Sequence, residues 1–190
     1  MRVIAGTLKG RRLKAPTWEG LRPTSDKLRE TLFNVLAPSV VDARVLDGFA
    51  GTGALGIEAI SRGAQDVTFI EHDERAVTLI TDNLAHCGIK SGYTVMRVPV
   101  ARGLEALRAD PGFLPFDIVL LDPPYYSSAD AVLTGLESVL ASDGVLVLEH
   151  ARKQQAPEIL GQLVRRREVR SGDSVLTFYG LKNSRLEARG

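Results

Sequence analysis

The chain of 190 residues is predicted to fold as one α/β domain built on a Rossmann-like, doubly wound sheet. Three observations support this class. Short apolar runs alternate with amphipathic stretches, a glycine-rich loop follows the first of the apolar runs, and 44% of the residues are hydrophobic, which is enough for one sizeable core. Because strands joined through helices lie parallel, we expect a parallel sheet that a C-terminal antiparallel hairpin completes to seven strands.

The first predicted element is a capped helix over residues 24–36, which Pro38 is expected to end. Strands and helices then take turns along the chain. The expected strands are residues 44–47, 67–71, 94–98, 117–122 and 144–149. The expected helices are residues 54–61, 74–87, 102–109 and 129–140. Residues 163–170 and 174–179 flank Ser171-Gly172-Asp173, a turn sequence that favours a hairpin over another crossover.

Composition limits the classes of protein to consider. The sequence has no apolar span of 18 residues and no apolar signal-peptide core near Met1, so we expect a cytoplasmic protein without a membrane partner. Cys87 is the single cysteine, which excludes an internal disulfide and favours a packing role. We divide the chain into a basic arm with the first helix (1–40), the α/β domain (41–182) and a tail (183–190).

Charge is unevenly distributed along the chain. Residues 1–30 hold 8 Lys/Arg against 3 Asp/Glu, residues 31–150 hold 7 against 16, and residues 151–190 hold 9 against 4. The three blocks therefore carry +5, −9 and +5, which add to the formal net charge of +1. Basic ends of this kind are suited to neutralising phosphates, although many such segments are only solvated surface. The arm contributes Arg2, Lys9, Arg11, Arg12, Lys14 and Arg22 as candidate nucleic-acid contacts.

The loop after the first strand is the predicted cofactor site. Gly51, Gly53 and Gly56 form the pattern G-x-G-x-x-G, and Glu71 follows at the end of the second strand. This pattern suits a dinucleotide, whose pyrophosphate would sit at the helix N-terminus. It also suits S-adenosylmethionine, which has no phosphate. Asp47 favours S-adenosylmethionine, because a carboxylate is unfavourable beside a pyrophosphate but favourable beside an ammonium or a sulfonium.

The tetrapeptide Asp122-Pro123-Pro124-Tyr125, directly after an apolar strand, is the predicted catalytic segment. Two prolines make a stiff corner that can aim the Asp122 carboxylate and a neighbouring carbonyl at the hydrogens of an exocyclic amine. Tyr125 can stack on the ring that carries this amine. Such a nitrogen is a poor nucleophile, and accepting its hydrogens raises its electron density during attack.

Together, the two segments predict methyl transfer to a base nitrogen. The tips of the first and fourth parallel strands lie on the same edge of such a sheet, so cofactor and amine would meet there. A dehydrogenase would leave Asp122-Pro123-Pro124-Tyr125 without a task. His72, His86 and His150 are not spaced as metal ligands, and the reaction needs no metal, so we predict no metal site.

The sequence resembles bacterial 16S rRNA guanine-N2 methyltransferases that modify a small-subunit hairpin loop. The resemblance covers nearly the whole chain and is most specific at the N-terminus. It rests on the segments Arg2-Val3-Ile4-Ala5-Gly6, Gly10-Arg11-Arg12-Leu13, Leu21-Arg22-Pro23-Thr24-Ser25-Asp26, Arg29-Glu30-Thr31-Leu32-Phe33-Asn34, the glycine loop from Leu46 to Ala59, and Asp122-Pro123-Pro124-Tyr125.

The resemblance implies roles for particular residues. The amine of guanine would be held by Asp122 and the Pro123 carbonyl, with Tyr125 stacked on the base. The pocket for S-adenosylmethionine would be lined by Asp47, Phe49, Gly51, Gly53 and Glu71. Arg22, Thr24 and Arg29 would belong to a segment that folds over the active site and contacts RNA, although packing of the first helix on the sheet is the simpler alternative.

Two positions depart from the family pattern. Many relatives have an acid or amide after the third strand to bind adenine, where this chain reads Val98-Pro99-Val100-Ala101, so we expect Val100 to contact the cofactor through its backbone. Gly48 stands where relatives often carry a larger side chain. The resemblance further implies a protein that acts on 16S rRNA, free or within the small ribosomal subunit. We expect it to be a monomer.

Several alternatives remain at this stage. Asp122-Pro123-Pro124-Tyr125 also suits adenine N6 in nucleic acid or a protein glutamine side chain, and the choice of guanine comes from the resemblance alone. A non-catalytic RNA-binding module with a methyltransferase fold is the alternative from a different class.

Overall fold

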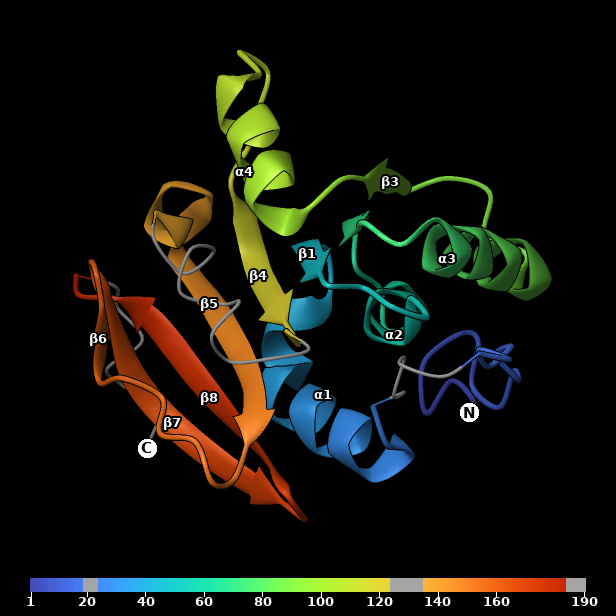
Figure 1. Ribbon diagram of the computed structural model, residues 1–190, viewed down its shortest axis with the longest axis horizontal. Helices are drawn as coiled ribbons and strands as arrows, with labels where there is room; N and C mark the ends of the chain where they lie inside the picture. Colours follow the sequence, from blue (N-terminus) through green and yellow to red (C-terminus); the bar gives the residue numbers. More distant parts are fainter. Residues whose placement is uncertain (19–23, 124–134, 184–190) are drawn as a thin grey trace.

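The computed structural model describes residues 1–18, 24–123 and 135–183. Its sheet has eight strands in the order β3-β2-β1-β4-β5-β8-β7-β6 (Figure 1). The strands are β1 (Arg44–Gly48), β2 (Asp66–Glu71), β3 (Tyr93–Arg97), β4 (Phe116–Leu121), β5 (Leu140–Ala151), β6 (Ile159–Leu160), β7 (Leu163–Ser171) and β8 (Ser174–Leu181). The helices are α1 (Asp26–Val40), α2 (Ala54–Ser61), α3 (Glu74–Cys87), α4 (Val100–Ala109) and the 3-10 turn η2 (Leu136–Ser138).

The sheet is parallel from β3 to β5 and antiparallel from β5 to β6. This arrangement confirms the Rossmann-like class with a C-terminal hairpin. The count of seven strands was wrong, because the two-residue strand β6 adds to the edge of β7. A strand this short follows from a local backbone contact and has no apolar run of its own that the sequence could reveal.

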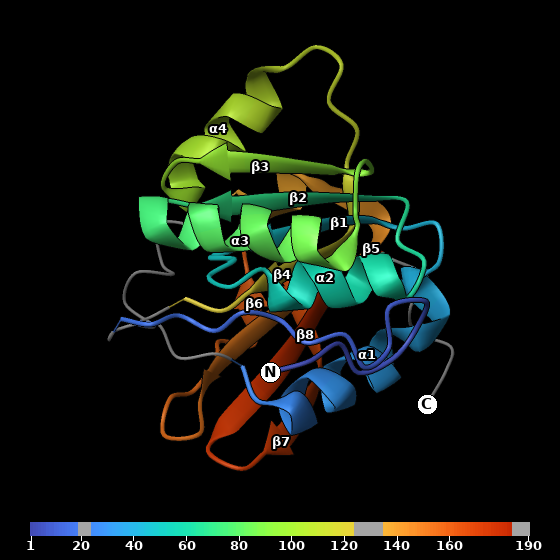
Figure 2. The same ribbon diagram turned by 90° about the vertical axis from the view of Figure 1, so that its right-hand side faces the viewer.

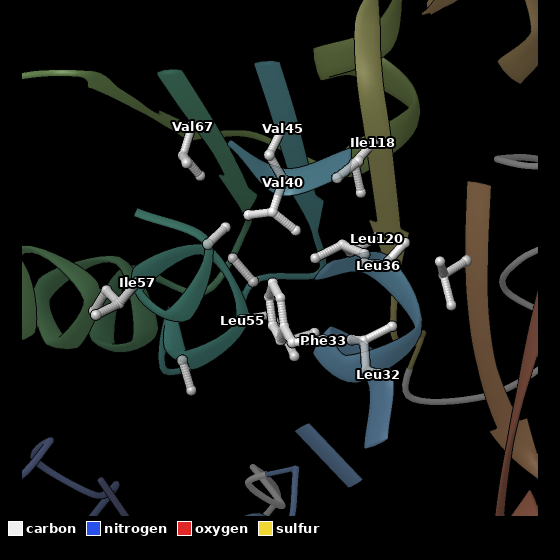
Figure 3. Close-up of a cluster of buried hydrophobic side chains, with 14 of the residues drawn as sticks. Leu32, Phe33, Leu36, Val40, Val45, Leu55, Ile57, Val67, Ile118 and Leu120 are labelled. Atoms are coloured by element: carbon white, nitrogen blue, oxygen red, sulfur yellow. The ribbon is translucent and has the colours of Figure 1, made fainter. Parts of the chain in front are cut away.

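Two apolar layers cover the faces of the sheet. Buried side chains of α1, α2 and α3 pack on one face, and those of α4 and η2 pack on the other. Figures 1 and 2 show α4 on the face of the sheet opposite to α2 and α3. In the first layer, Phe33 and Leu32 of α1 lie beside Leu55 of α2 and below Val45 and Leu120 of the central strands (Figure 3).

Helix α1 is longer than expected. Ser25 caps its first turn by accepting a hydrogen bond from the Leu28 amide at 3.2 Å, but the helix continues past Pro38 to Val40. The proline removes one backbone hydrogen bond, and its fixed φ is still compatible with a helix. Val40 is 1% exposed and packs in the core. The final turn is therefore held by tertiary packing that the sequence pattern does not show.

The expected helix 129–140 is also revised where the structure describes it. Residues 124–134 lie outside the described residues, and of the remainder only Leu136–Ser138 forms a 3-10 turn. Strand β5 begins at Leu140, earlier than expected, because Leu140 pairs with Phe116, the first residue of β4. The register shifts between this pair and the regular pairing that starts with Val145 opposite Ile118, so Ser142-Asp143-Gly144, a sequence that alone favours a turn, forms an irregularity within β5.

Candidate active site

The predicted site residues gather at the edge where the parallel strands end. Strands β1 and β4 are paired neighbours, with Asp47 opposite Leu120 and Gly48 opposite Leu121. The loop that follows β1 and the segment that begins at Asp122 therefore start side by side. This is the edge where ligands of open α/β sheets bind.

Asp47 lies at the end of β1 and is 1% exposed. One of its carboxylate oxygens accepts a hydrogen bond of 2.8 Å from the Gly56 amide in the first turn of α2. Burial raises the pKa of Asp47 to about 8, the Gly56 hydrogen bond opposes this, and the charges of Asp122 and Glu71 add to it. Among the residues that the structure describes, no cation pairs with the Asp47 carboxyl group, and its raised pKa means that a cation at this site would be strongly favourable.

The glycines of the loop have specific structural tasks. Gly53 is the residue before α2 and has a φ of 74°, in the left-handed region that a side chain would strain. Gly56 lies where α2 crosses β2, and a Cβ there would come within 2.2 Å of the Phe69 ring. Gly51 and Phe49 also have positive φ, of 54° and 62°. The loop therefore brings its backbone close to the strand tips.

Glu71, at the end of β2, holds this loop from the other side. Its carboxylate accepts the Gly51 amide at 3.0 Å and the amides of His72 and Asp73 at 2.7 and 2.9 Å. Glu71 is 6% exposed within this network. Glu71 thus lies on the strand next to the one that carries Asp47. Its carboxylate has lone pairs beyond those used by the three amides, and these could accept the predicted hydrogen bonds from a ribose.

Asp122 directly follows β4 and accepts a hydrogen bond from the Thr24 hydroxyl at 3.3 Å. Burial raises its pKa to about 6, and the Thr24 hydrogen bond acts in the opposite direction. Thr24 stands just before the N-cap of α1, so this contact brings the start of α1 to the predicted catalytic carboxylate. Pro123 follows Asp122 in the described chain. Pro124 and Tyr125 lie outside the described residues.

Val100 is the first residue of α4 and is 4% exposed. It lies beside Gly48, where an added Cβ would stand 3.6 Å from Val100 and 2.6 Å from Leu121. Leu121 thus occupies the space that a larger side chain at position 48 would need. The small residue at the end of β1 and the large one on β4 are complementary, so Gly48 leaves no empty space at this point.

The N-terminal arm is docked on the domain. The Glu58 carboxylate of α2, fully buried, accepts the amides of Ile4 and Ala5 at 2.7 and 3.0 Å. Asn83 of α3 accepts the Lys14 amide at 2.7 Å and donates to the Thr52 carbonyl in the cofactor loop at 3.0 Å. Figure 1 shows the arm lying beside α2 and α3.

The candidate RNA-binding residues fall into two groups. Arg2, Lys9, Arg11, Arg12 and Lys14 are exposed on the arm. Arg2 and Lys14 are each paired with an aspartate, at 3.6 and 2.9 Å. Arg29 is fully buried and donates to the Arg2 carbonyl at 2.6 Å and to Asp26 at 2.7 Å. In this placement Arg29 anchors the arm and is not accessible to a phosphate. Arg22 lies outside the described residues.

Glu58 and Asn83 were not singled out from the sequence, although both carry a recognisable signal. Each stands on a buried face of its helix: Glu58 follows Ala54 and Leu55 by four and three residues, and Asn83 follows Leu79 and Ile80 by four and three. A polar side chain at such a position is buried and must find hydrogen-bond partners. What the sequence does not show is that these partners are backbone groups of the distant arm.

Three further features of the described chain bear on the choice of site: a cavity, possible metal-ligand groups and possible membrane-spanning helices. A cavity of about 280 Å³, lined by Ser39, Asp42, Asp117 and Asp143 among others, opens at the opposite edge, where the strands begin. Within the described ranges, no group of three or more His, Cys, Asp and Glu side chains is arranged to hold a metal ion. None of the helices in those ranges is long and apolar enough to cross a membrane.

Comparison with known proteins gives consistent results. Residues 1–180 match the family described as conserved hypothetical protein 95. A Bacillus subtilis protein named "Putative rRNA methyltransferase YlbH" is 38% identical over 94% of this chain and 98% of its own length. The Escherichia coli "Ribosomal RNA small subunit methyltransferase D" is 47% identical over 66% of this chain and 60% of its own length. The solved structure of "Putative methyltransferase yhhF from Escherichia coli" superposes with a TM-score of 0.82, at 33% identity, over 95% of this chain and 97% of that one.

Proposed function

We propose that this chain, which belongs to the conserved hypothetical protein 95 family together with relatives named rRNA methyltransferases, transfers a methyl group from S-adenosylmethionine to rRNA. The observation that carries the proposal is the convergence of Asp47, Glu71 and Asp122 at one edge of the sheet, where Asp47 and Glu71 are buried, Asp122 is half-buried, and the pKa values of Asp47 and Asp122 are raised. Such a group of carboxylates favours a cationic ligand beside an amine acceptor.

The residues of the glycine loop are suited to S-adenosylmethionine. Asp47 retains one carboxylate oxygen beyond the one bonded to Gly56, and this oxygen can face the ligand's ammonium directly or through water. Glu71 keeps the loop at the tip of β2 by accepting the Gly51 amide. From there its carboxylate can also accept hydrogen bonds from the ribose hydroxyls. The ligand supplies an electrophilic methyl group on a sulfonium and a neutral thioether leaving group. Asp47 balances positive charge near the reacting centre.

Asp122 acts on the nucleophile. Its ionised carboxylate accepts a hydrogen of the exocyclic amine, which orients the nitrogen and raises its electron density. The new N–CH₃ bond forms as the S–CH₃ bond breaks, and the methylated nitrogen releases one proton to Asp122 or to water. The resulting products are a methylamino base and the neutral thioether, so charge and atoms balance. Pro123 is proposed to add its carbonyl as a second acceptor.

We further propose that the target is the N2 amine of a guanine in a small-subunit 16S rRNA loop. The name of the Escherichia coli relative supports the small subunit, and the exposed basic arm supports a phosphate-containing partner. A loop base costs less to extract than a paired one, which suits a small domain. The protein would act as a monomer in the cytoplasm, where ribosomal subunits are assembled.

Comparison of the wild type with Asp122→Ala tests the proposal. Calorimetry gives the affinity for S-adenosylmethionine, filter binding gives the affinity for 16S rRNA, and a methyl-labelled cofactor gives the transfer rate. We expect Asp122→Ala to keep both affinities within a few-fold and to lose transfer by at least a hundredfold. Full activity of Asp122→Ala would refute the catalytic assignment. A wild type that binds rRNA and transfers no methyl group would favour the non-catalytic binding module.

A further inference from the structure

A second group of exposed cations lies far from the arm in sequence. Arg152 and Lys153 occupy the turn after β5, and Arg170 stands near the end of β7. Within the described part of the chain, none of the three makes an ion pair, whereas Arg165 on the same hairpin pairs with Glu158 and Glu168 at 3.1 Å. Free cations on an exposed turn retain their full capacity to bind anions.

Strand register places this group at the active-site edge. The turn after β5 is joined to the turn between β7 and β8, because the Arg152 amide donates a hydrogen bond to the Asp173 carbonyl at 2.8 Å. Leu148 of β5 pairs with Leu121, the residue before Asp122, so Glu149 is the neighbour of Asp122 across the sheet. Glu149 then pairs with Leu176, and Leu176 with Val169, the residue before Arg170. Strands β4 and β7 are separated by three strand spacings of about 4.8 Å each. Arg170 on β7 therefore lies roughly 15 Å to the side of β4, which Asp122 follows.

This position is complementary to that of the arm. Figure 1 places α1 between the arm and the β7–β8 hairpin, so the two basic groups lie on opposite sides of that helix. The centre of the edge is acidic, with Asp47, Glu71 and Asp122 together. The described carboxyl groups of this centre offer no cationic contact to a polyanion whose base enters it, so cations on both sides are what would hold its phosphates.

We propose that Arg152, Lys153 and Arg170 bind backbone phosphates of the RNA substrate on the side of the site away from the arm. This inference rests on the proposed function. Asp173 is the single acidic residue in the two turns, so the surface carries a clear positive excess. The lateral separation of roughly 15 Å between Arg170 and strand β4, which Asp122 follows, corresponds to a few nucleotides beyond the target base. The surface therefore positions a strand and does not read its bases.

A matched pair of double variants tests the inference. The test variant is Lys153→Ala with Arg170→Ala. The control is Lys90→Ala with Lys182→Ala, which removes the same charge from exposed positions near the opposite edge, before β3 and after β8. For each full-length protein, binding to 16S rRNA is measured between 50 and 300 mM salt, and KM for the RNA is obtained from methyl transfer.

The test variant should lower the slope of log K against log salt by about 1.4, since each lost phosphate contact to single-stranded RNA contributes about 0.7. Its KM for RNA should rise while kcat at saturating RNA and the affinity for S-adenosylmethionine stay at the wild-type values. The control should keep the wild-type slope. An unchanged slope in the test variant, or an equal fall in the control, would overturn the inference. Absence of transfer by the wild type would instead count against the proposed function.

Discussion

Replacing Asp47 by asparagine should stabilise the ligand-free protein and abolish cofactor binding. The buried carboxyl has a folded-state pKa of about 8, against 3.8 as its ordinary value. Between these two pH values the folded state holds a proton that the unfolded state has released. The wild type therefore loses stability as pH rises across this range. Asparagine keeps an oxygen that can accept the Gly56 amide and removes the titration.

The size of the effect follows from proton linkage. From pH 5 to pH 7, both within the range between the two pKa values, each pH unit changes the free energy of unfolding by about 1.36 kcal/mol. The stability of Asp47→Asn relative to the wild type should thus rise by about 2.7 kcal/mol over those two units. Other titrating groups are common to both proteins, so their contributions cancel in the difference.

Urea unfolding of both proteins at pH 5, 6 and 7 without ligand measures this difference. A second series with S-adenosylmethionine should stabilise the wild type according to ligand concentration over Kd, and should leave Asp47→Asn unchanged. A difference between the two proteins that does not vary with pH would refute the buried, ligand-free carboxyl as the origin of the effect. A variant with wild-type cofactor affinity would refute its role at the ammonium.

Three further predictions concern the acceptor, the arm and its anchor. Because Asp122 must be ionised to accept an amine hydrogen and its pKa is raised to about 6, single-turnover methyl transfer should rise with pH through about 6 and then level off; a flat profile from pH 5 to 7 would contradict this. Replacing Arg11 and Arg12 by alanine should weaken RNA binding and reduce its salt slope by about 1.4 without changing cofactor affinity, and an unchanged slope would mean that the arm does not contact phosphate. Glu58→Ala leaves two arm amides and Arg62 unpaired, so it should lose about 3–5 kcal/mol in urea unfolding and expose the arm to limited proteolysis, with Glu58→Gln as the milder control; an arm that stays resistant in Glu58→Ala would show that it is held elsewhere.

The sequence predicted the elements whose signals are local. Helices Ala54–Ser61 and Glu74–Cys87 have the expected bounds, because a left-handed Gly53 and the capping Asp73 define their starts. The predicted bounds were wrong where contacts between residues distant in the sequence determine where an element begins or ends. Val40 in the core carries α1 past Pro38, and pairing with Phe116 extends β5 to Leu140. Neither contact leaves a trace in the neighbouring residues.

The same division applies to the site. Asp47, Glu71 and Asp122 stand at strand ends, and parallel topology alone brings strand ends to one edge, so their proximity could be expected. The docking of the arm could not, because it depends on Glu58 and Asn83 meeting backbone amides more than 50 residues away. Burial of Arg29 follows from the same docking, since the arm covers its guanidinium.

The most direct test is the identity of the methylated nucleoside. Small ribosomal subunits that lack the modification are incubated with the protein and methyl-labelled S-adenosylmethionine, and the digested RNA is separated and weighed by mass spectrometry. We predict a single labelled product, N2-methylguanosine, from the wild type and none from Asp122→Ala. N6-methyladenosine would keep the chemistry of Asp122 and contradict the proposed target. Absence of label in both subunits and free rRNA would contradict the account of this site as an rRNA methyltransferase.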